Sequence, residues 1–212
     1  MFVATRMTGN PFTVTPETTV PDAAAIMKKH NVRHLPVVES GRVVGVIANS
    51  DVAKASPSPA TSLSASELTY LFGKLKVGSI MTRDPITIAP GALLEMAAVA
   101  MRDNKIEMLP VVDNGKLVGV ITESAILDAF IELLGFRDSG TRLTLDAEDA
   151  PGMLALLGET AAKHNANVQH VAVYRHEGRS TVVFGVNTTN TEALEADLAA
   201  RGFEVIARLV NP

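Results

Sequence analysis

The chain has 212 residues, of which 47% are hydrophobic, and its formal net charge at pH 7 is −4. This balance argues against a nucleic-acid binder, which concentrates Lys and Arg on one face to neutralise phosphates. The absence of cysteine excludes disulfides, thiolate metal sites and a cysteine nucleophile. No apolar run is long enough to cross a bilayer, and residues 1–21 lack the apolar core of a signal peptide. We therefore expect a cytoplasmic protein without a membrane partner.

An internal repeat organises the first two thirds of the chain. Residues 7–52 align without gaps with residues 81–126, and 18 of the 46 aligned pairs are identical. The identities cluster in three places: Met-Thr at the start of each copy, Leu-Pro-Val-Val near its middle and Val-Gly-Val-Ile near its end. Matches of this kind in one register indicate a duplicated structural unit.

The first half of each copy predicts a strand followed by a helix. The strand is expected near Thr13–Val14 in the first copy and near Thr87–Ile88 in the second. In the first copy, apolar residues at helical spacing follow Thr19, which has the residue type of an N-cap. In the second copy, Leu94, Ala97, Ala98 and Met101 place one apolar face on a helix.

The second half of each copy predicts a hairpin. Two β-branched runs flank a polar turn with glycine, at residues 39–42 in the first copy and 113–116 in the second. Each copy is then β-α-β-β followed by a helix. One copy is too small to cover both faces of its sheet, so we expect the two copies to pack against each other as a pseudo-twofold pair.

The segment between the copies predicts a loop and a helix. Residues 56–62 are rich in Ser and Pro. Ser64 and Glu67 have capping-box spacing, and an apolar stripe follows, formed by Leu68, Leu71, Phe72 and Leu75. This helix would return the chain to the second copy. The same stripe could instead form a subunit contact.

The C-terminal third predicts a separate domain. A helix over 125–134 ends at Gly135, and residues 137–140 have the composition of a linker. The expected elements that follow are a strand at 141–145, a helix to His164, strands at 168–174 and 181–186, a helix at 192–200 and a strand at 204–210. The order β-α-β-β-α-β is ferredoxin-like, and the predicted fold class of the chain is α+β.

The repeated marks resemble those of the cystathionine-β-synthase (CBS) domain family, whose paired copies form Bateman modules. The whole chain, with its Ser-Pro-Ser loop and the segment from Glu67 to Leu71, resembles the acetoin utilisation protein B (AcuB) family. The resemblance implies a tandem CBS pair over residues 1–136, with repeat one at 7–55, a linker and return helix at 56–78 and repeat two at 79–134. After the linker at 137–140, residues 141–212 would form an ACT-like domain.

In the CBS superfamily, ligand-binding copies end in the pattern Gly-apolar-apolar-Thr/Ser-x-x-Asp. Its Asp accepts hydrogen bonds from the ribose hydroxyls, and its Thr donates to a phosphate oxygen. Here the pattern is split between the copies. The first copy retains Asp51 but has Ala48 where Thr is expected, and the second retains Thr122 but has Ala125 in place of Asp. The alternative is that Asp51 is an ordinary N-cap, since Asp is favoured where a strand turns into a helix.

Adenylate-binding members of the family often carry a basic pair just before Leu-Pro-Val, and Arg33 and His34 stand there in the first copy. An Arg guanidinium suits a phosphate because its planar fork donates two parallel hydrogen bonds. The resemblance thus implies a ligand site in the CBS cleft, formed by Arg33, His34, Asp51 and Thr122. Its candidate ligands are AMP, ADP, ATP and S-adenosylmethionine. Alternatively, the basic pair is solvated or pairs with a carboxylate such as Glu39.

The sequence Asp149-x-Pro151-Gly152-x-Leu154 resembles the ACT family, regulatory domains that often bind amino acids at paired interfaces. The resemblance implies an amino-acid site at Asp149 and Gly152, since glycine permits close approach and the following helix N-terminus favours a carboxylate. A turn without a ligand explains the motif equally well. In the ACT family the sheets pair edge to edge, and an exposed edge strand needs to be covered, so we expect a homodimer.

The function indicated is regulation by a small ligand. Ligand in the CBS cleft would change the orientation of the two copies, and helix 125–134 would pass the change to the ACT-like domain and an unidentified protein partner. The acetoin family suggests acetoin or acetate metabolism as the pathway. The histidines show no metal-ligand spacing, so we expect no metal site and no enzyme. The alternative is a structural module that only dimerises or docks on a partner, which the split motifs favour.

Overall fold

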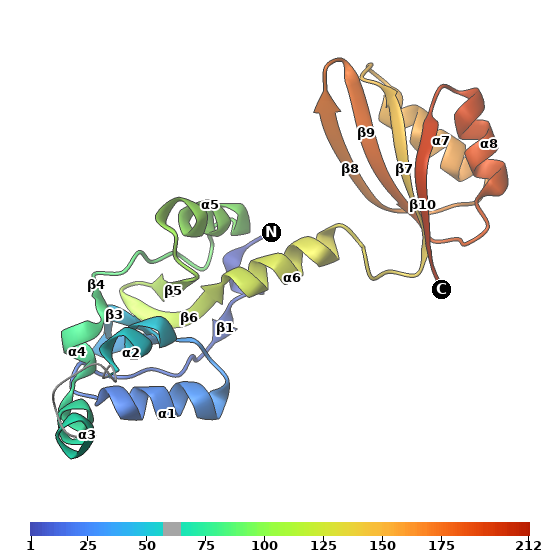
Figure 1. The fold of residues 1–212 in the computed structure, drawn as a ribbon. Helices are drawn as coiled ribbons and strands as arrows, with labels where there is room; N and C mark the ends of the chain where they lie inside the picture. The colour runs from blue at the N-terminus through green and yellow to red at the C-terminus, as the bar shows by residue number, and fades with distance from the viewer. Residues whose placement is uncertain (57–64) are drawn as a thin grey trace. The chain divides into compact units, whose positions relative to one another are not determined.

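A computed structural model describes residues 1–56 and 65–212 of the chain (Figure 1). These residues form two compact units, Met1–Leu127 and Asp128–Pro212. Helix α6, Glu123–Leu133, begins in the first unit and ends in the second. The domain boundaries drawn from the sequence stay a prediction.

Both repeats contain a helix, a hairpin and a second helix, as predicted. In the first repeat these are α1 (Val20–His30), β2 (His34–Glu39), β3 (Arg42–Ala48) and α2 (Asn49–Ala55). In the second they are α5 (Leu94–Asn104), β5 (Met108–Asp113), β6 (Lys116–Thr122) and α6. The predicted N-cap of α1 is confirmed, because the Thr19 side chain accepts a hydrogen bond from the backbone N–H of Asp22.

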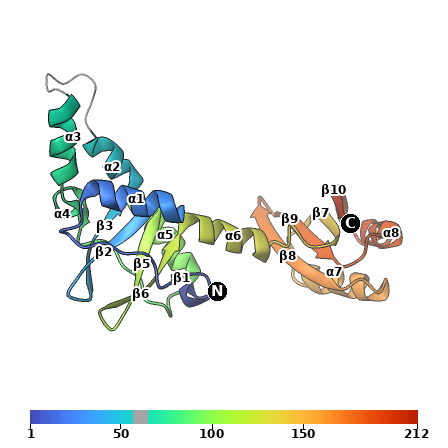
Figure 2. The ribbon, with the colours of Figure 1, turned by 90° about the horizontal axis from the view of Figure 1, so that it is seen from below.

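The two hairpin turns have the same backbone conformation. Ser40 and Gly41 have φ angles of 50° and 79°, and Asn114 and Gly115 have 49° and 80°. Two consecutive positive φ angles are the mark of a type I′ turn, whose twist matches that of the flanking strands. Both turns lie at the same end of the first unit, where they line one groove (Figure 2).

The repeats exchange their first strands. β1 (Thr8–Gly9) pairs with β6 of the second repeat, and β4 (Thr82–Arg83) pairs with β3 of the first. Each three-stranded sheet is therefore completed by the other repeat. The predicted strands near Thr13–Val14 and Thr87–Ile88 are wrong in extent, because each is reduced to a single parallel bridge to β2 or β5.

Glycines in the exchanged sheets leave room for methionines of the opposite repeat. A Cβ atom on Gly45 would lie 2.5 Å from Met81 Sδ and 2.9 Å from the Thr82 carbonyl oxygen. A Cβ atom on Gly119 would lie 2.7 Å from Met7 Sδ and 2.9 Å from the Thr8 carbonyl oxygen. The Met-Thr sequence of each repeat thus packs against the Val-Gly-Val-Ile sequence of the other repeat.

The segment between the repeats forms helices α3 (Ala65–Lys74) and α4 (Val77–Ile80). Phe72 and Leu75 pack against the buried core of the first repeat, to which Val77 belongs. This supports the interpretation of α3 as a return helix. The predicted capping box depends on Ser64, which lies outside the described residues.

The second unit is a four-stranded antiparallel sheet with two helices. In chain order its elements are β7 (Gly140–Glu148), α7 (Met153–Lys163), β8 (Val168–His176), β9 (Arg179–Val186), α8 (Glu192–Ala200) and β10 (Glu204–Asn211). The strand order is β10-β7-β9-β8, which is the ferredoxin-like arrangement predicted. Both helices lie on the same face of the sheet (Figure 1). Leu143, Phe184 and Leu157 belong to the buried core of this unit.

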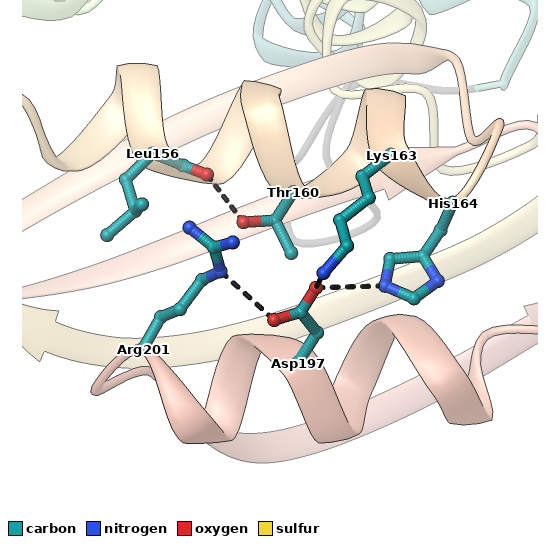
Figure 3. A network of polar contacts seen from close by, with 6 residues as sticks. All are labelled: Leu156, Thr160, Lys163, His164, Asp197 and Arg201. Atoms are coloured by element: carbon teal, nitrogen blue, oxygen red, sulfur yellow. Dashed lines mark hydrogen bonds and ion pairs between the residues drawn. The ribbon is translucent and has the colours of Figure 1, made fainter.

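One carboxylate joins the two helices of this unit. Asp197 on α8 accepts hydrogen bonds from Lys163 Nζ at 2.8 Å, Arg201 Nε at 3.0 Å and His164 Nε2 at 3.1 Å (Figure 3). Hydrogen bonds from Lys163, Arg201 and His164 hold the pKa of Asp197 well below its ordinary range.

The residues that follow α6 are fixed to this sheet. His170 on β8 places Nδ1 3.1 Å from the Leu133 carbonyl oxygen and Nε2 2.6 Å from Asp138 Oδ2. Arg142 Nη1 donates to the Leu134 carbonyl oxygen at 2.7 Å. Gly135 ends the helix as predicted, with φ of 61°, and any Cβ there would overlap the His170 ring. The predicted linker is thus held against the second unit by side-chain hydrogen bonds.

Candidate functional site

The first unit has a cavity of about 290 Å³ between the two repeats. We call it the Arg33 cavity. Its polar and aromatic lining comes from the first repeat at Phe12, Arg33 and His34, and from the second at Glu107, Thr122 and Ser124. The volume lies close to the lower end of the range of small-molecule sites, which starts at about 300 Å³.

A second cavity, of about 410 Å³, also lies between the repeats. We call it the Asp51 cavity. The first repeat contributes His34, Ala48, Ser50 and Asp51, and the second contributes Asp84, Lys105, Glu107 and Met108. His34, Glu107 and Met108 line both cavities, so they form a shared wall.

The two cavities are equivalent sites of the duplicated unit. A shift of 74 positions converts Thr122 and Ser124 of the first cavity into Ala48 and Ser50 of the second. It likewise converts Asn10, Phe12 and Asn31 into Asp84, Ile86 and Lys105. The cavities therefore share a backbone framework but differ in side-chain chemistry.

The structure divides the predicted ligand residues between these cavities. Arg33, His34 and Thr122 line the first, whereas Asp51 lines the second together with His34. The single cleft site implied by the resemblance is thus two half-sites. That these side chains bind a ligand stays a prediction.

Asp51 and Thr122 each take part in helix capping. Thr122 precedes α6, and its Oγ1 accepts a hydrogen bond from the backbone N–H of Ala125 at 3.3 Å. The N-cap residue of α2 is Ala48, so the prediction of Asp51 as N-cap is wrong. Asp51 lies at N3 of the helix, and its Oδ2 accepts a hydrogen bond from the backbone N–H of Ala48 at 2.9 Å. A capping box combines both bonds at one helix start. Each repeat here retains one half of that box, which gives both residues a structural role.

Arg33 and His34 face a carboxylate of the opposite repeat. Glu107 Oε2 lies 4.0 Å from Arg33 Nη1 and 3.7 Å from His34 Nε2. The pairing carboxylate is therefore Glu107, rather than Glu39, which the sequence suggested as one alternative. The Arg33 and Glu107 side chains are 69% and 53% exposed, and such exposed pairs contribute only about 0–1 kcal/mol. A ligand phosphate can therefore displace Glu107 from Arg33 at small cost.

His34 is the more buried member of this group, with its side chain 15% exposed. Burial lowers the pKa of His34 below its ordinary value of 6.5, and the charge of Arg33 acts in the same direction, while Glu107 opposes both. The imidazole is therefore neutral at pH 7. It can donate or accept one hydrogen bond in either cavity without adding charge.

Several lining residues were not singled out as binding candidates. Phe12 presents an aromatic ring to the Arg33 cavity and stacks on His30 with ring centroids 3.7 Å apart. Asp84 contributes a carboxylate to the Asp51 cavity. Each differs from its counterpart in the other repeat, Ile86 or Asn10, so comparison of the aligned repeats could have found them.

The predicted site of the second unit lies at the start of α7. Gly152 is the N-cap residue and has φ of 89°, a conformation that favours glycine. Asp149 Oδ1 lies 3.3 Å from Arg175 Nε of β8. An acidic and a basic side chain thus lie together beside the loop. Amino-acid binding there stays a prediction.

Metal-binding clusters and membrane-spanning helices are both absent from the described residues. Over residues 1–56 and 65–212, no group of three or more His, Cys, Asp or Glu side chains is placed to hold a metal ion. In the same part of the chain, each helix is too short or too polar to span a bilayer.

Comparison with known proteins defines the class of protein. The CBS domain profile matches residues 3–58 and 77–132, which together exceed half of the chain. A TTHA0829-like ACT domain profile matches residues 139–208. The chain therefore belongs to the CBS-domain family, as a tandem CBS pair followed by an ACT domain.

Its relatives include short CBS proteins and larger enzymes. The chain is 30% identical to the CBS domain-containing protein YhcV of Bacillus subtilis, over 67% of this chain and 92% of that protein. It is 32% identical to inosine-5'-monophosphate dehydrogenase of Korarchaeum cryptofilum, over 74% of this chain. The match spans only 32% of the length of that dehydrogenase.

Solved structures of CBS pairs are similar to the first unit. A Vibrio cholerae protein described as an acetoin utilization protein (AcuB) has a TM-score of 0.54 and 29% identity, over 65% of this chain and 96% of that one. The CBS pair of protein MJ0100, solved with 5'-methylthioadenosine and S-adenosylmethionine, has a TM-score of 0.51 and 30% identity, over 61% and 95%. CBSX2, solved with AMP, has a TM-score of 0.52 and 32% identity, over 62% of this chain and 96% of that one.

Proposed function

We propose that this protein senses an adenosine-containing ligand in its CBS module and regulates a protein partner through its ACT-like domain. The observation that carries the proposal is the Arg33 cavity, which is lined by Arg33 and His34 of one repeat and by Thr122 and Ser124 of the other. A ligand there contacts both repeats at once, so its binding depends on how they are oriented.

The chemistry of the cavity suits an adenosine phosphate. Arg33 offers a guanidinium whose fork fits phosphate oxygens, and Thr122 offers a hydroxyl on the opposite wall. Phe12 supplies an aromatic face of the kind on which nucleobases stack. The structures of MJ0100 and CBSX2 with adenosine compounds support this class of ligand.

The signal would leave the CBS module through α6. The helix follows directly after Thr122, which lines the cavity, and its C-terminal end is fixed to the sheet of the second unit by His170 and Arg142. Movement at one end of a continuous helix is thereby carried to the other. The coupling can be no larger than the difference in ligand affinity between the two states.

The proposal extends to features that rest on family resemblance. We propose a cytoplasmic, non-catalytic homodimer, with acetoin or acetate metabolism as the pathway and an amino acid as a second effector at Asp149 and Gly152. The AcuB-like neighbour supports the pathway. The predicted domain limits, 1–136 and 141–212, belong to the same proposal.

A purely structural module is the second candidate function. The hydrogen bonds that Asp51 and Thr122 make at helix starts favour it, because capping alone accounts for both residues. Such a module would dimerise or dock on a partner without a ligand.

Calorimetric titration of AMP, ADP, ATP and S-adenosylmethionine into the full chain separates these functions. We expect at least one of them to bind. Arg33→Ala should lower the affinity for AMP, ADP or ATP about 10- to 100-fold, since a hydrogen bond to a charged group contributes about 1.5–3 kcal/mol. Glu39→Gln serves as a control because Glu39 lies outside both cavities. Absence of binding by the unaltered protein would overturn adenosine sensing and leave an amino-acid effector at Gly152 or a purely structural module.

A further inference from the structure

The two cavities differ in the charge that they present to a ligand. The Arg33 cavity contains one arginine and one carboxylate, Arg33 and Glu107, so its formal charges balance. The Asp51 cavity contains three carboxylates, Asp51, Asp84 and Glu107, against the single ammonium group of Lys105. His34 lines both and is neutral at pH 7. One framework therefore produces a neutral site with a guanidinium and an acidic site.

This difference arises at equivalent positions of the duplicated unit. Asn10 in the first cavity corresponds to Asp84 in the second. Arg33, the cation of the first cavity, corresponds to Glu107. Lys105 replaces Asn31 and offsets only part of the change. An anion in the Asp51 cavity would meet repulsion that the same anion avoids in the Arg33 cavity.

We propose that the two cavities select adenosine compounds by charge. The Arg33 cavity takes an adenosine phosphate, and the Asp51 cavity takes an adenosine compound with a cationic sulfonium group. The inference rests on the proposed function, since it needs adenosine compounds to bind the module at all. It goes beyond that function because it assigns a different ligand class to each cavity.

The shared wall couples the two sites. Glu107 Oε2 now lies 4.0 Å from Arg33 Nη1, so the guanidinium partly neutralises it. A phosphate bound at Arg33 competes for that guanidinium and leaves the Glu107 carboxylate less compensated. Because Glu107 also lines the Asp51 cavity, a cation there gains attraction. The two ligands should therefore strengthen each other, and by linkage the factor is the same in both directions.

Calorimetry with AMP and S-adenosylmethionine as probes tests the proposal on the full chain. We expect one AMP and one S-adenosylmethionine per chain, bound together, each with an affinity raised a few-fold by the other. Arg33→Gln should weaken AMP binding about tenfold or more and strengthen S-adenosylmethionine binding about two- to fourfold, because it leaves the Glu107 carboxylate without its guanidinium partner. Asp84→Asn, which installs the residue found at Asn10, should weaken S-adenosylmethionine by about threefold to tenfold and leave AMP at Arg33 unchanged.

Glu107→Gln gives the sharpest signature. It removes a competitor of phosphate from one cavity and an attracting charge from the other, so AMP should bind more tightly and S-adenosylmethionine more weakly, each by about threefold. The same exchange at Glu39, outside both cavities, is the matched control and should change neither affinity. Melting curves of the variants verify folding, and Arg33 and Glu107 are exposed enough to be replaced without disturbing the core.

The outcomes separate this inference from the function on which it rests. Competition between the two probes for one site would overturn charge selection and leave the sensing function standing. The same would follow if AMP filled both cavities of the unaltered protein, or if Glu107→Gln moved both affinities in one direction. If none of the adenosine compounds binds the unaltered protein, the sensing function and the inference both fall.

Discussion

The two CBS repeats share their backbone framework but differ at the positions that line the two cavities. Both have a type I′ hairpin turn and a glycine that receives a methionine of the other repeat. At the cavities, by contrast, Arg33 stands opposite its own counterpart, Glu107, and Thr122 corresponds to Ala48. The comparison separates the positions that the fold constrains from those at which the side-chain chemistry of the two cavities differs. It also explains how a duplicated unit can hold two sites that are no longer alike.

The largest expected effects come from the constrained positions. Gly45→Ala and Gly119→Ala would each place a Cβ within 3.0 Å of a methionine sulfur and a backbone carbonyl. We expect each to lower the free energy of unfolding by about 1–3 kcal/mol. Urea denaturation measures this, with Gly9→Ala as a control because a Cβ there meets no atom within 4 Å. Clearly unequal decreases in the free energy of unfolding for the two variants would contradict the structural equivalence of the repeats.

The two halves of the capping box should contribute to stability in both repeats. Thr122→Ala removes the side-chain bond to the N–H of Ala125, and Asp51→Ala removes the bond to the N–H of Ala48. We expect each to lower the free energy of unfolding by about 0.5–2 kcal/mol. Denaturation of both variants, combined with AMP titration of Thr122→Ala and S-adenosylmethionine titration of Asp51→Ala, separates the two roles. Unchanged stability with lost ligand binding would show that these residues act on ligand alone.

Adding the N-cap hydroxyl that the first repeat lacks tests the comparison of the two helix starts further. Ala48→Thr adds the N-cap hydroxyl to a helix start that already has Asp51, which completes the capping box. We expect the free energy of unfolding to rise by about 0.5–1 kcal/mol, as measured by urea denaturation. Ala48→Ser is the matching variant without the methyl group. A loss of stability in both variants would mean that the lining of the Asp51 cavity has no room for a hydroxyl.

We expect the smallest effect on the stability of the CBS pair from a substitution in the second unit, at Asp197. Asp197 has a folded-state pKa below the ordinary value of 3.8, so its charge stabilises the ACT unit above that pH. This contribution is lost as the pH falls below about 3.8 towards the folded-state value. Asp197→Asn should lower the melting temperature of the ACT unit at pH 7 and flatten its acid dependence. Calorimetric melting should show no shift in the melting temperature of the CBS unit. A shift there would contradict the division of the chain into two units that unfold independently.

The sequence predicted those helices and strands whose apolar residues recur at regular spacing or that are joined by a recognisable turn. The hairpins follow from β-branched runs around Ser40-Gly41 and Asn114-Gly115, and α1 follows from Thr19 and its apolar face. The exchange of β1 and β4 could not be predicted, because two-residue strands have no periodicity. Their pairing depends on contacts between residues more than 30 positions apart.

The site was only half predictable for a related reason. The resemblance implied Arg33, His34, Asp51 and Thr122 as ligand candidates, but a motif does not state which of two equivalent cavities each residue lines. The structure assigns Asp51 to one cavity and Thr122 to the other. It also brings Glu107 to Arg33 from a strand region 74 residues away, which spacing cannot show.

The most direct test of the account is a crystal structure of the full chain grown with AMP. The account predicts density for one nucleotide in the Arg33 cavity, with its phosphate within hydrogen-bonding distance of the Arg33 guanidinium and its base beside Phe12. A nucleotide in the Asp51 cavity, or saturating AMP with neither cavity occupied, would contradict it.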